Sequence, residues 1–333
     1  MTAGPARVLE ALRGAGGRSC SGESLSRGRG VSRAQVWKDV QVLRARGYRI
    51  EASPGGGYRL EGTPDRLYPE EIQAGLATRW LGREIRFFES TDSTNRVALE
   101  LARDGAPHGT TVVAESQTAG RGRLGRSFFS PPHRNLYTSI VLRPDSTTAE
   151  ASTWVLAAAV SVADAVAETV GDSPAVEIKW PNDVLLGGLK TSGILMELGA
   201  EATRVSHLVL GIGVNLNTRR GEFPPEFRAT ATSLASHIGR AVDRVAFARR
   251  LYRCLEQTLD ACAAGGFDAV RPRFEARFRM RGRRIRVIEG PDPTGFAGVA
   301  LGIDAQGALR VRRDDAEVVH VIAGDVTLAK ESP

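Results

Sequence analysis

A glycine- and arginine-rich segment between two strand patterns, residues 117–131, constrains the fold of this chain most strongly. Its central part, 120–126, reads Gly-Arg-Gly-Arg-Leu-Gly-Arg. Glycine lets backbone amides come close to a ligand, and guanidinium groups bind phosphate or carboxylate oxygens with paired hydrogen bonds. Because segments rich in β-branched and apolar residues flank it at 109–116 and 135–142, the sequence predicts an anion-binding loop inside a folded domain, not a disordered Gly-Arg tail.

The composition indicates an ordinary globular protein with two or three domains. The chain has 333 residues, of which 42% are hydrophobic. The first residues lack the apolar run of a secretion signal, and the most apolar stretch, 154–170, carries Ser161, Asp164 and Glu168, which favours a buried helix over a membrane span. The three cysteines show no metal or redox spacing. We therefore expect a cytoplasmic protein with no disulfide and no membrane partner.

The basic surplus is concentrated at the N-terminus. The net charge is +7, and residues 1–62 hold eleven Lys and Arg against five Asp and Glu, so six of the seven charges lie there. A basic surplus confined to one small segment indicates a nucleic-acid partner, although a solvated basic face gives the same count.

The first 63 residues have the pattern of a winged helix-turn-helix domain. Helical patterns cover 6–13 and 22–29, and Ser32 opens a third helix that Gly47 ends, with Gln35 placed to complete a capping box. Strand patterns then flank a glycine turn at 53–56. In such a domain the residues that would face the major groove are Arg33, Gln35, Trp37 and Lys38. Arg49 and Arg59 would lie near phosphates. A small helical domain used only for dimerisation remains an alternative.

The central part, 64–282, has the pattern of an α+β domain. Strand patterns lie at 85–89, 176–180, 192–198 and 205–216, and helical patterns at 95–104, 153–170 and 245–263. Two more strand patterns flank the glycine- and arginine-rich segment 117–131, which we call the arginine loop. The strands then outnumber the crossover helices that a regular doubly wound sheet needs. A mixed sheet with helices is therefore predicted.

Four further motifs fall in this domain, and their order is more informative than any one of them. They are Ser-Thr-Asp-Ser-Thr-Asn at 90–95, Lys-Trp-Pro-Asn-Asp at 179–183, Lys-Thr-Ser-Gly-Ile-Leu-Met-Glu at 190–197 and Gly-Ile-Gly-Val-Asn-Leu-Asn at 211–217. Singly, a helix cap, a surface lysine or a packed strand explains each. With the arginine loop, the set resembles the biotin–protein ligases, and the N-terminal domain makes it similar to their bifunctional ligase/biotin-operon repressor form.

The resemblance implies a fold and a reaction. It implies a central domain similar to class II aminoacyl-tRNA synthetases and a C-terminal SH3-like β-barrel at 283–333, where four short strand patterns lie. It also implies that ATP and biotin, with Mg²⁺, form biotinyl-5'-AMP. Biotin then passes to a lysine of the biotin carboxyl carrier protein of acetyl-CoA carboxylase. Repression at operator DNA and a ligand-promoted homodimer through the central sheet are further implications.

The same resemblance implies roles for individual residues. Arg121 and Arg123 would bind the phosphates and the reactive intermediate, and Lys190 would bind the carboxylate and phosphoryl oxygens, which makes these three the catalytic candidates. The remaining ligand-binding candidates are Ser93, Thr94, Gln117 and the Gly122 backbone for biotin, Asn182 and Phe128 for the nucleotide, and Asp183 for Mg²⁺. Asn95 is a further cofactor-binding candidate. Phe128 stands where the family more often has tryptophan, and Leu124 where an arginine is common.

Two other functions fit the same residues. One is a regulator that binds biotin or its adenylate without transferring it, which the presence of Lys190 disfavours. The other is a related acyl ligase that uses lipoate.

Overall fold

The computed structural model describes residues 1–28, 30–53, 55–171, 174–289 and 294–328 of the chain. It divides into two compact units, Met1–Arg66 and a larger unit that begins at Leu67. Arg29 of the predicted second helix and Pro54 of the predicted turn lie outside the described residues.

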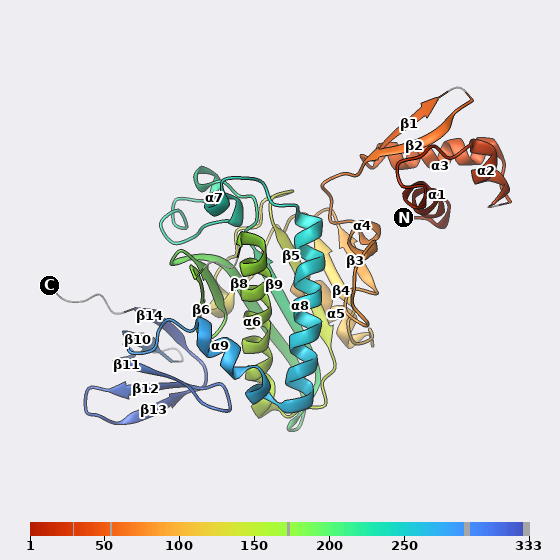
Figure 1. Ribbon diagram of the computed structural model, residues 1–333. Helices are drawn as coiled ribbons and strands as arrows, with labels where there is room; N and C mark the ends of the chain where they lie inside the picture. Colours follow the sequence, from red (N-terminus) through yellow and green to blue (C-terminus); the bar gives the residue numbers. More distant parts are fainter. Residues whose placement is uncertain (29, 54, 172–173, 290–293, 329–333) are drawn as a thin grey trace. The chain divides into compact units, whose positions relative to one another are not determined.

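The N-terminal unit has the predicted order of three helices and a hairpin (Figure 1). Ser32 caps the third helix by accepting the Gln35 N–H at 3.1 Å, and Val36, Val40 and Leu43 on its inner face are fully buried. The reciprocal half of the capping box was predicted wrongly, because the Gln35 amide donates to Asp39 at 3.0 Å. The elements are α1 (Ala3–Gly14), α2 (Gly22–Arg27), α3 (Arg33–Ala45), β1 (Arg49–Ser53) and β2 (Gly57–Gly62).

The larger unit is built on a seven-stranded sheet in the order β3-β4-β5-β9-β8-β7-β6. The pair β3 and β4 is parallel, and the other neighbours are antiparallel, so the predicted mixed sheet is confirmed. The strands are β3 (Ile85–Phe88), β4 (Thr111–Ala114), β5 (Leu136–Leu142), β6 (Val176–Lys179), β7 (Asp183–Leu186), β8 (Leu189–Glu201) and β9 (Arg204–Val214).

Helices cover both faces of this sheet because its central strands bury residues on both sides (Figure 1). Val113 and Ile140 belong to the main core with α6 (Ala151–Val170) and α8 (Arg244–Gly265), whereas their neighbours Val112 and Val141 pack against α5 (Thr94–Arg103). The helical stretch Thr148–Val170 is long and apolar enough to cross a membrane, but 72% of its apolar 18-residue window is buried in the fold, as in a core helix.

Short elements complete the unit. The helices α4 (Pro69–Gln73), α7 (Leu234–Ile238) and α9 (Arg271–Arg277) connect the longer ones and were not predicted. Short 3₁₀ turns, including Arg123–Gly125 in the arginine loop, also lie between the predicted elements.

The C-terminal strands form a five-stranded antiparallel sheet in the order β13-β12-β11-β10-β14. Among the described residues no pairing joins the outer strands β13 and β14, so the predicted SH3-like barrel is not confirmed. The strands are β10 (Arg284–Ile288), β11 (Phe296–Ile303), β12 (Leu309–Arg313), β13 (Val318–Val321) and β14 (Asp325–Leu328).

Candidate active site

A cleft of about 770 Å³ in the larger unit gathers the predicted ligand-binding residues. They come from the start of α5, the arginine loop, the β6–β7 hairpin and the strand β8, and Gly211, Ile212 and Gly213 of β9 also line the cleft. Segments more than 90 residues apart in the sequence therefore meet at one site. The predicted residues that line the cleft are Ser93, Thr94, Asn95, Gln117, Arg121, Gly122, Arg123, Phe128, Asn182, Asp183 and Lys190.

At one end of the cleft, neutral polar side chains form a connected network. The Gln117 Oε1 accepts the Thr94 backbone N–H at 2.9 Å and faces the Thr94 hydroxyl at 3.1 Å, while the Gln117 amide donates to Ser130 at 2.9 Å. The Ser139 hydroxyl lies 2.8 Å from Thr94 Oγ1 and 2.7 Å from Asn95 Oδ1. Paired donors and acceptors in fixed positions can recognise a neutral polar group such as a ureido ring.

Two glycines of β9 leave room for side chains that lie on the sheet. A Cβ on Gly211 would overlap Asn95 Oδ1, and a Cβ on Gly213 would lie 2.5 Å from Phe128 Cε1. Asn95 and the ring of Phe128 therefore approach the sheet closely at these two glycines. That ring also meets Tyr137 edge to face, with centroids 6.4 Å apart.

At the other end of the cleft, the arginine loop contacts the C-terminal sheet. Arg123 donates to Asn182 Oδ1 at 3.0 Å and to the Gly324 carbonyl at 2.9 Å, and Arg126 pairs with Asp325 at 2.5 Å. Burial lowers the pKa of Arg123, against the pull of Asp325 and Asp183. Burial also opposes ionisation of Asp325, but its hydrogen bond from Arg126 and the surrounding cations hold the pKa of that carboxyl below its usual value.

Lys190 lies at the start of β8 and lines the same cleft. Its Nζ is 2.6 Å from Asp183 Oδ1 on the neighbouring strand. Its backbone accepts from Thr232 and donates to Thr230 at 2.9 and 2.8 Å, which fixes the loop before α7 beside the cleft. Asp183 was predicted to hold a metal, and here it forms an ion pair with the predicted catalytic lysine. Within the described ranges no group of three or more His, Cys, Asp or Glu could hold a metal ion.

Three later segments contribute to the cleft and were not predicted. These residues lie outside every recognised motif, so no local pattern marks them, apart from the dense arginines at 279–284. They are Phe227, Ala229, Thr230 and Ala231 in the loop before α7, Arg279, Met280 and Arg283 just before β10, and Asp325 and Thr327 in β14.

The predicted DNA-contacting side chains are all on the surface of the N-terminal unit. Arg33, Trp37 and Lys38 are exposed on α3, and Trp37 is 54% exposed, which is high for a tryptophan. Three of these side chains have partners that were not foreseen. Gln35 bonds Asp39, as above, and Arg33 forms an ion pair with Glu23 at 3.3 Å. Arg59 on the hairpin forms ion pairs with Glu51 and Glu61 at 2.6 and 2.5 Å. The charge of Arg59 is thus largely balanced, whereas Arg49 contacts the Glu61 carbonyl at 3.5 Å.

Family comparisons cover each part of the chain. A model described as "Biotin/lipoate A/B protein ligase family" matches residues 87–215, which include the neutral polar network, the arginine loop and Lys190. A model described as "HTH domain" matches residues 6–59, and one described as "Biotin protein ligase C terminal domain" matches residues 282–328.

Individual proteins are similar over almost the full length. The "Bifunctional ligase/repressor BirA" of Bacillus subtilis is 36% identical over 96% of this chain and 97% of its own length, and that of Escherichia coli is 34% identical over 93% and 92%. Among solved structures, the biotin protein ligase from Aquifex aeolicus in complex with biotin and ATP matches 75% of this chain and 100% of its own. Its TM-score is 0.64 at 26% identity.

Proposed function

Because this chain belongs to the biotin protein ligase family, in its bifunctional ligase/repressor form, we propose that its cleft joins biotin to ATP and then hands biotin to a carrier lysine. The observation that carries this proposal is the convergence of the neutral polar network, Arg123 and Lys190 on one cleft. A bicyclic vitamin with a carboxylate and a triphosphate needs such a site, polar at one end and cationic at the other.

In the first step, a carboxylate oxygen of biotin bonds to the α-phosphorus of ATP while the bond to pyrophosphate breaks. Negative charge builds on the phosphoryl oxygens. We assign Arg121, Arg123 and Lys190 to these oxygens, because preorganised cations in a water-poor site stabilise such charge most strongly. Asn182 already holds Arg123 through a hydrogen bond and would orient it toward the nucleotide.

In the second step, the carrier lysine amine bonds to the acyl carbon, AMP leaves, and the amine releases a proton to water. The neutral end of the cleft keeps its hold on the vitamin throughout. Here Ser93, Thr94, Asn95 and Gln117, with the Gly122 backbone, are assigned to biotin. Phe128 is assigned to the adenine by stacking, for which its ring would have to turn from the β9 glycines.

Mg²⁺ fits this site only as a companion of the nucleotide. Asp183 offers one carboxylate, and it is paired with Lys190. Magnesium is commonly held by one or two carboxylates together with substrate phosphates, so ATP would supply most of its ligands. In that role Mg²⁺ would supply charge neutralisation for the leaving pyrophosphate.

The assignment of Lys190 and Arg123 is tested by adenylate formation. Purified protein is mixed with biotin and Mg·ATP, and biotinyl-5'-AMP and labelled carrier domain are measured by mass spectrometry. Lys190→Ala and Arg123→Ala are expected to lose at least about a hundredfold in rate, as removal of a single transition-state donor does in other enzymes. Full activity in either variant contradicts the assignment.

We further propose that the N-terminal unit binds operator DNA as a ligand-promoted homodimer that forms through the central sheet. The exposed side chains Arg33, Trp37 and Lys38 on α3 are those that would enter a major groove. The carrier is proposed to be the biotin carboxyl carrier protein of acetyl-CoA carboxylase, and the protein is proposed to act in the cytoplasm. Sedimentation with and without biotin and ATP tests the dimer, and an unchanged monomer contradicts it.

A further inference from the structure

A fully buried ion pair lies beside the arginine loop. Glu115 directly follows β4, and Arg244 begins α8, 129 residues later; Arg244 Nη1 is 2.7 Å from Glu115 Oε2, and both side chains are 0% exposed. Neither residue is among those described as lining the cleft. Removing two charges from water often costs more than their attraction returns, so stability alone is a weak reason for such a pair.

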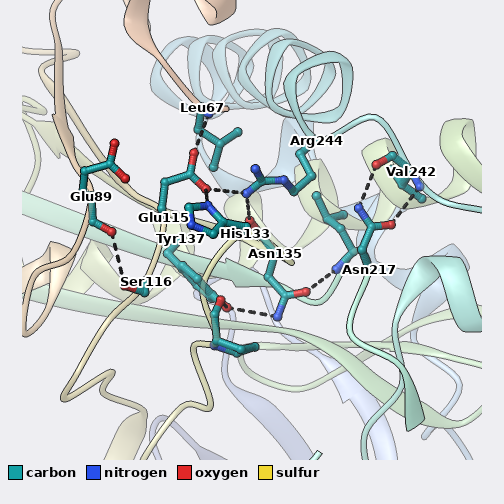
Figure 2. Close-up of polar contacts among 12 residues, drawn as sticks. Leu67, Glu89, Glu115, Ser116, His133, Asn135, Tyr137, Asn217, Val242 and Arg244 are labelled. Carbon is teal, nitrogen blue, oxygen red and sulfur yellow. Dashed lines mark hydrogen bonds and ion pairs between the residues drawn. The ribbon is translucent and has the colours of Figure 1, made fainter. Parts of the chain in front are cut away.

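Glu115 joins the two ends of the arginine loop, residues 117–131, which is called the ligand loop from here on. The backbone N–H of His133, just after the loop, donates to the Glu115 carbonyl at 3.2 Å. The His133 ring nitrogen Nδ1 also lies 3.2 Å from Glu115 Oε2, and the other carboxylate oxygen accepts the Leu67 N–H at 2.8 Å (Figure 2). The Glu115 carbonyl and carboxylate therefore hold the end of the ligand loop through His133, and the carboxylate also binds the first residue of the larger unit.

Arg244 extends these contacts toward the cleft. Its Nη1 lies 3.4 Å from the Asn135 carbonyl, and the Asn135 amide donates to the Tyr137 hydroxyl at 3.1 Å. That hydroxyl donates to the carbonyl of Pro131, the last residue of the ligand loop, at 2.9 Å. Since Tyr137 lines the cleft and its ring meets Phe128, a continuous series of contacts joins the buried pair to the cleft (Figure 2).

We infer that Glu115 and Arg244 are a positioning pair that holds both ends of the ligand loop and thereby sets the affinity for biotin without touching it. A loop with this many glycines loses much conformational entropy when it orders on a ligand. Fixing its base in advance lowers that cost and raises affinity. The inference deepens the proposed function and rests on it, because it assigns the loop to biotin.

A double variant separates positioning from stability. Glu115→Gln alone leaves the buried Arg244 charge without the opposite charge of Glu115, and Arg244→Met alone does the same to Glu115. Both single variants are therefore expected to lower Tm. The combination removes both charges and keeps the volume, so it should recover most of the lost Tm. If the pair positions the loop, the recovered double variant still shows a KM for biotin raised at least about tenfold, with kcat changed less than about threefold. If the pair only stabilises, KM returns with Tm, and a wild-type KM in the stable double variant overturns the inference.

The matched control removes another ion pair of the same unit. Asp164 on α6 and Arg277 on α9 lie 3.2 Å apart, their side chains are 21–22% exposed, and neither lines the cleft; Asp164 also pairs with Arg273. The variant Asp164→Asn with Arg277→Met is expected to keep the wild-type KM for biotin. If the double variant of Glu115 and Arg244 does not fold, Glu115→Asp is used in its place, because it keeps the charge but moves it back by one methylene. Glu115→Asp is expected to raise the KM for biotin about fivefold or more. An unchanged KM in this variant also overturns the inference. A wild-type protein that makes no adenylate refutes the proposed function instead.

Discussion

A methyl group has no room at position 211, because a Cβ there would overlap the Asn95 amide oxygen that also bonds Ser139. Gly211→Ala is therefore expected to displace Asn95 from the neutral end of the cleft and to raise the KM for biotin about tenfold or more. The control is Gly221→Ala, where a Cβ meets nothing within 4 Å. Initial rates of adenylate formation at varied biotin concentration give the KM of both variants. Equal KM values would contradict the claim that Gly211 makes room for Asn95 in the biotin site.

For single residues, the sequence predicted side chains that the structure brings to one cleft, but it did not predict their partners. Residues of the arginine loop, Lys190 and Gln117 could be proposed as ligand-binding residues because each stands in a motif of recognisable order. The contact of Arg123 with the Gly324 carbonyl joins residues 201 positions apart, and the Glu115–Arg244 pair joins residues 129 apart. Such partners depend on tertiary packing, and neither a period nor a spacing in one sequence records them.

Among the structural elements, the ligand loop gives a direct prediction. Its arginines are trypsin sites, and Leu124 between them is 67% exposed. Binding of biotin and ATP should close the loop over the ligand and slow cleavage after Arg121, Arg123 and Arg126 by about tenfold or more. Timed digests read by mass spectrometry check this, with cleavage after exposed Arg18 of the other unit as the internal control. Equal loop cleavage with and without both ligands would argue against closure.

The helix α8 is joined to the start of the larger unit by one carboxylate. Glu256 accepts the backbone N–H groups of Arg79, Trp80 and Leu81 at 2.7, 2.8 and 3.0 Å, and its side chain is 8% exposed. Burial opposes its ionisation, but the three N–H groups and the charge of Arg79 outweigh burial and hold the pKa of Glu256 below its usual value.

Because the pKa of Glu256 is lowered in the folded state, the free energy of unfolding depends on pH. The stabilisation is complete above the usual glutamate pKa of about 4.3 and is lost as pH falls through the lower folded-state value. Glu256→Gln is expected to reduce the free energy of unfolding by about 1–3 kcal/mol at pH 7, and the difference should shrink toward pH 3. Urea unfolding at both pH values measures it, with exposed Glu226→Gln as control. A difference that does not change with pH would contradict the role of the charge.

Long periodic elements were predictable, and short ones were not. The helices α3, α5, α6 and α8 and the hairpin of the N-terminal unit lie within a few residues of their predicted bounds, because apolar periodicity, caps and glycine turns agree there. The helices α4 and α7 have five residues each and the strand β14 has four, too few for a period to show. Closure of the C-terminal barrel was expected from resemblance alone, and the sheet among the described residues is open.

For the whole molecule, two compact units imply two separable activities. Trp37→Ala, on the exposed face of α3, is expected to weaken binding to the preferred DNA about tenfold or more while biotin transfer keeps its wild-type rate. Duplexes are first selected from a random pool by the wild-type protein with biotin and ATP, and affinities are then measured by fluorescence anisotropy at two salt concentrations. Failure of the selection to enrich any sequence would contradict operator binding.

One cleft is proposed to bind biotin at its neutral polar end and to activate it at its cationic end. The most direct measurement incubates the full chain with Mg·ATP and equal concentrations of biotin and lipoate, and then quantifies both acyl-adenylates by mass spectrometry. We predict biotinyl-5'-AMP in large excess in the wild type and its loss in Lys190→Ala. Lipoyl-adenylate as the main product, or undiminished biotinyl-5'-AMP in the variant, would contradict the account.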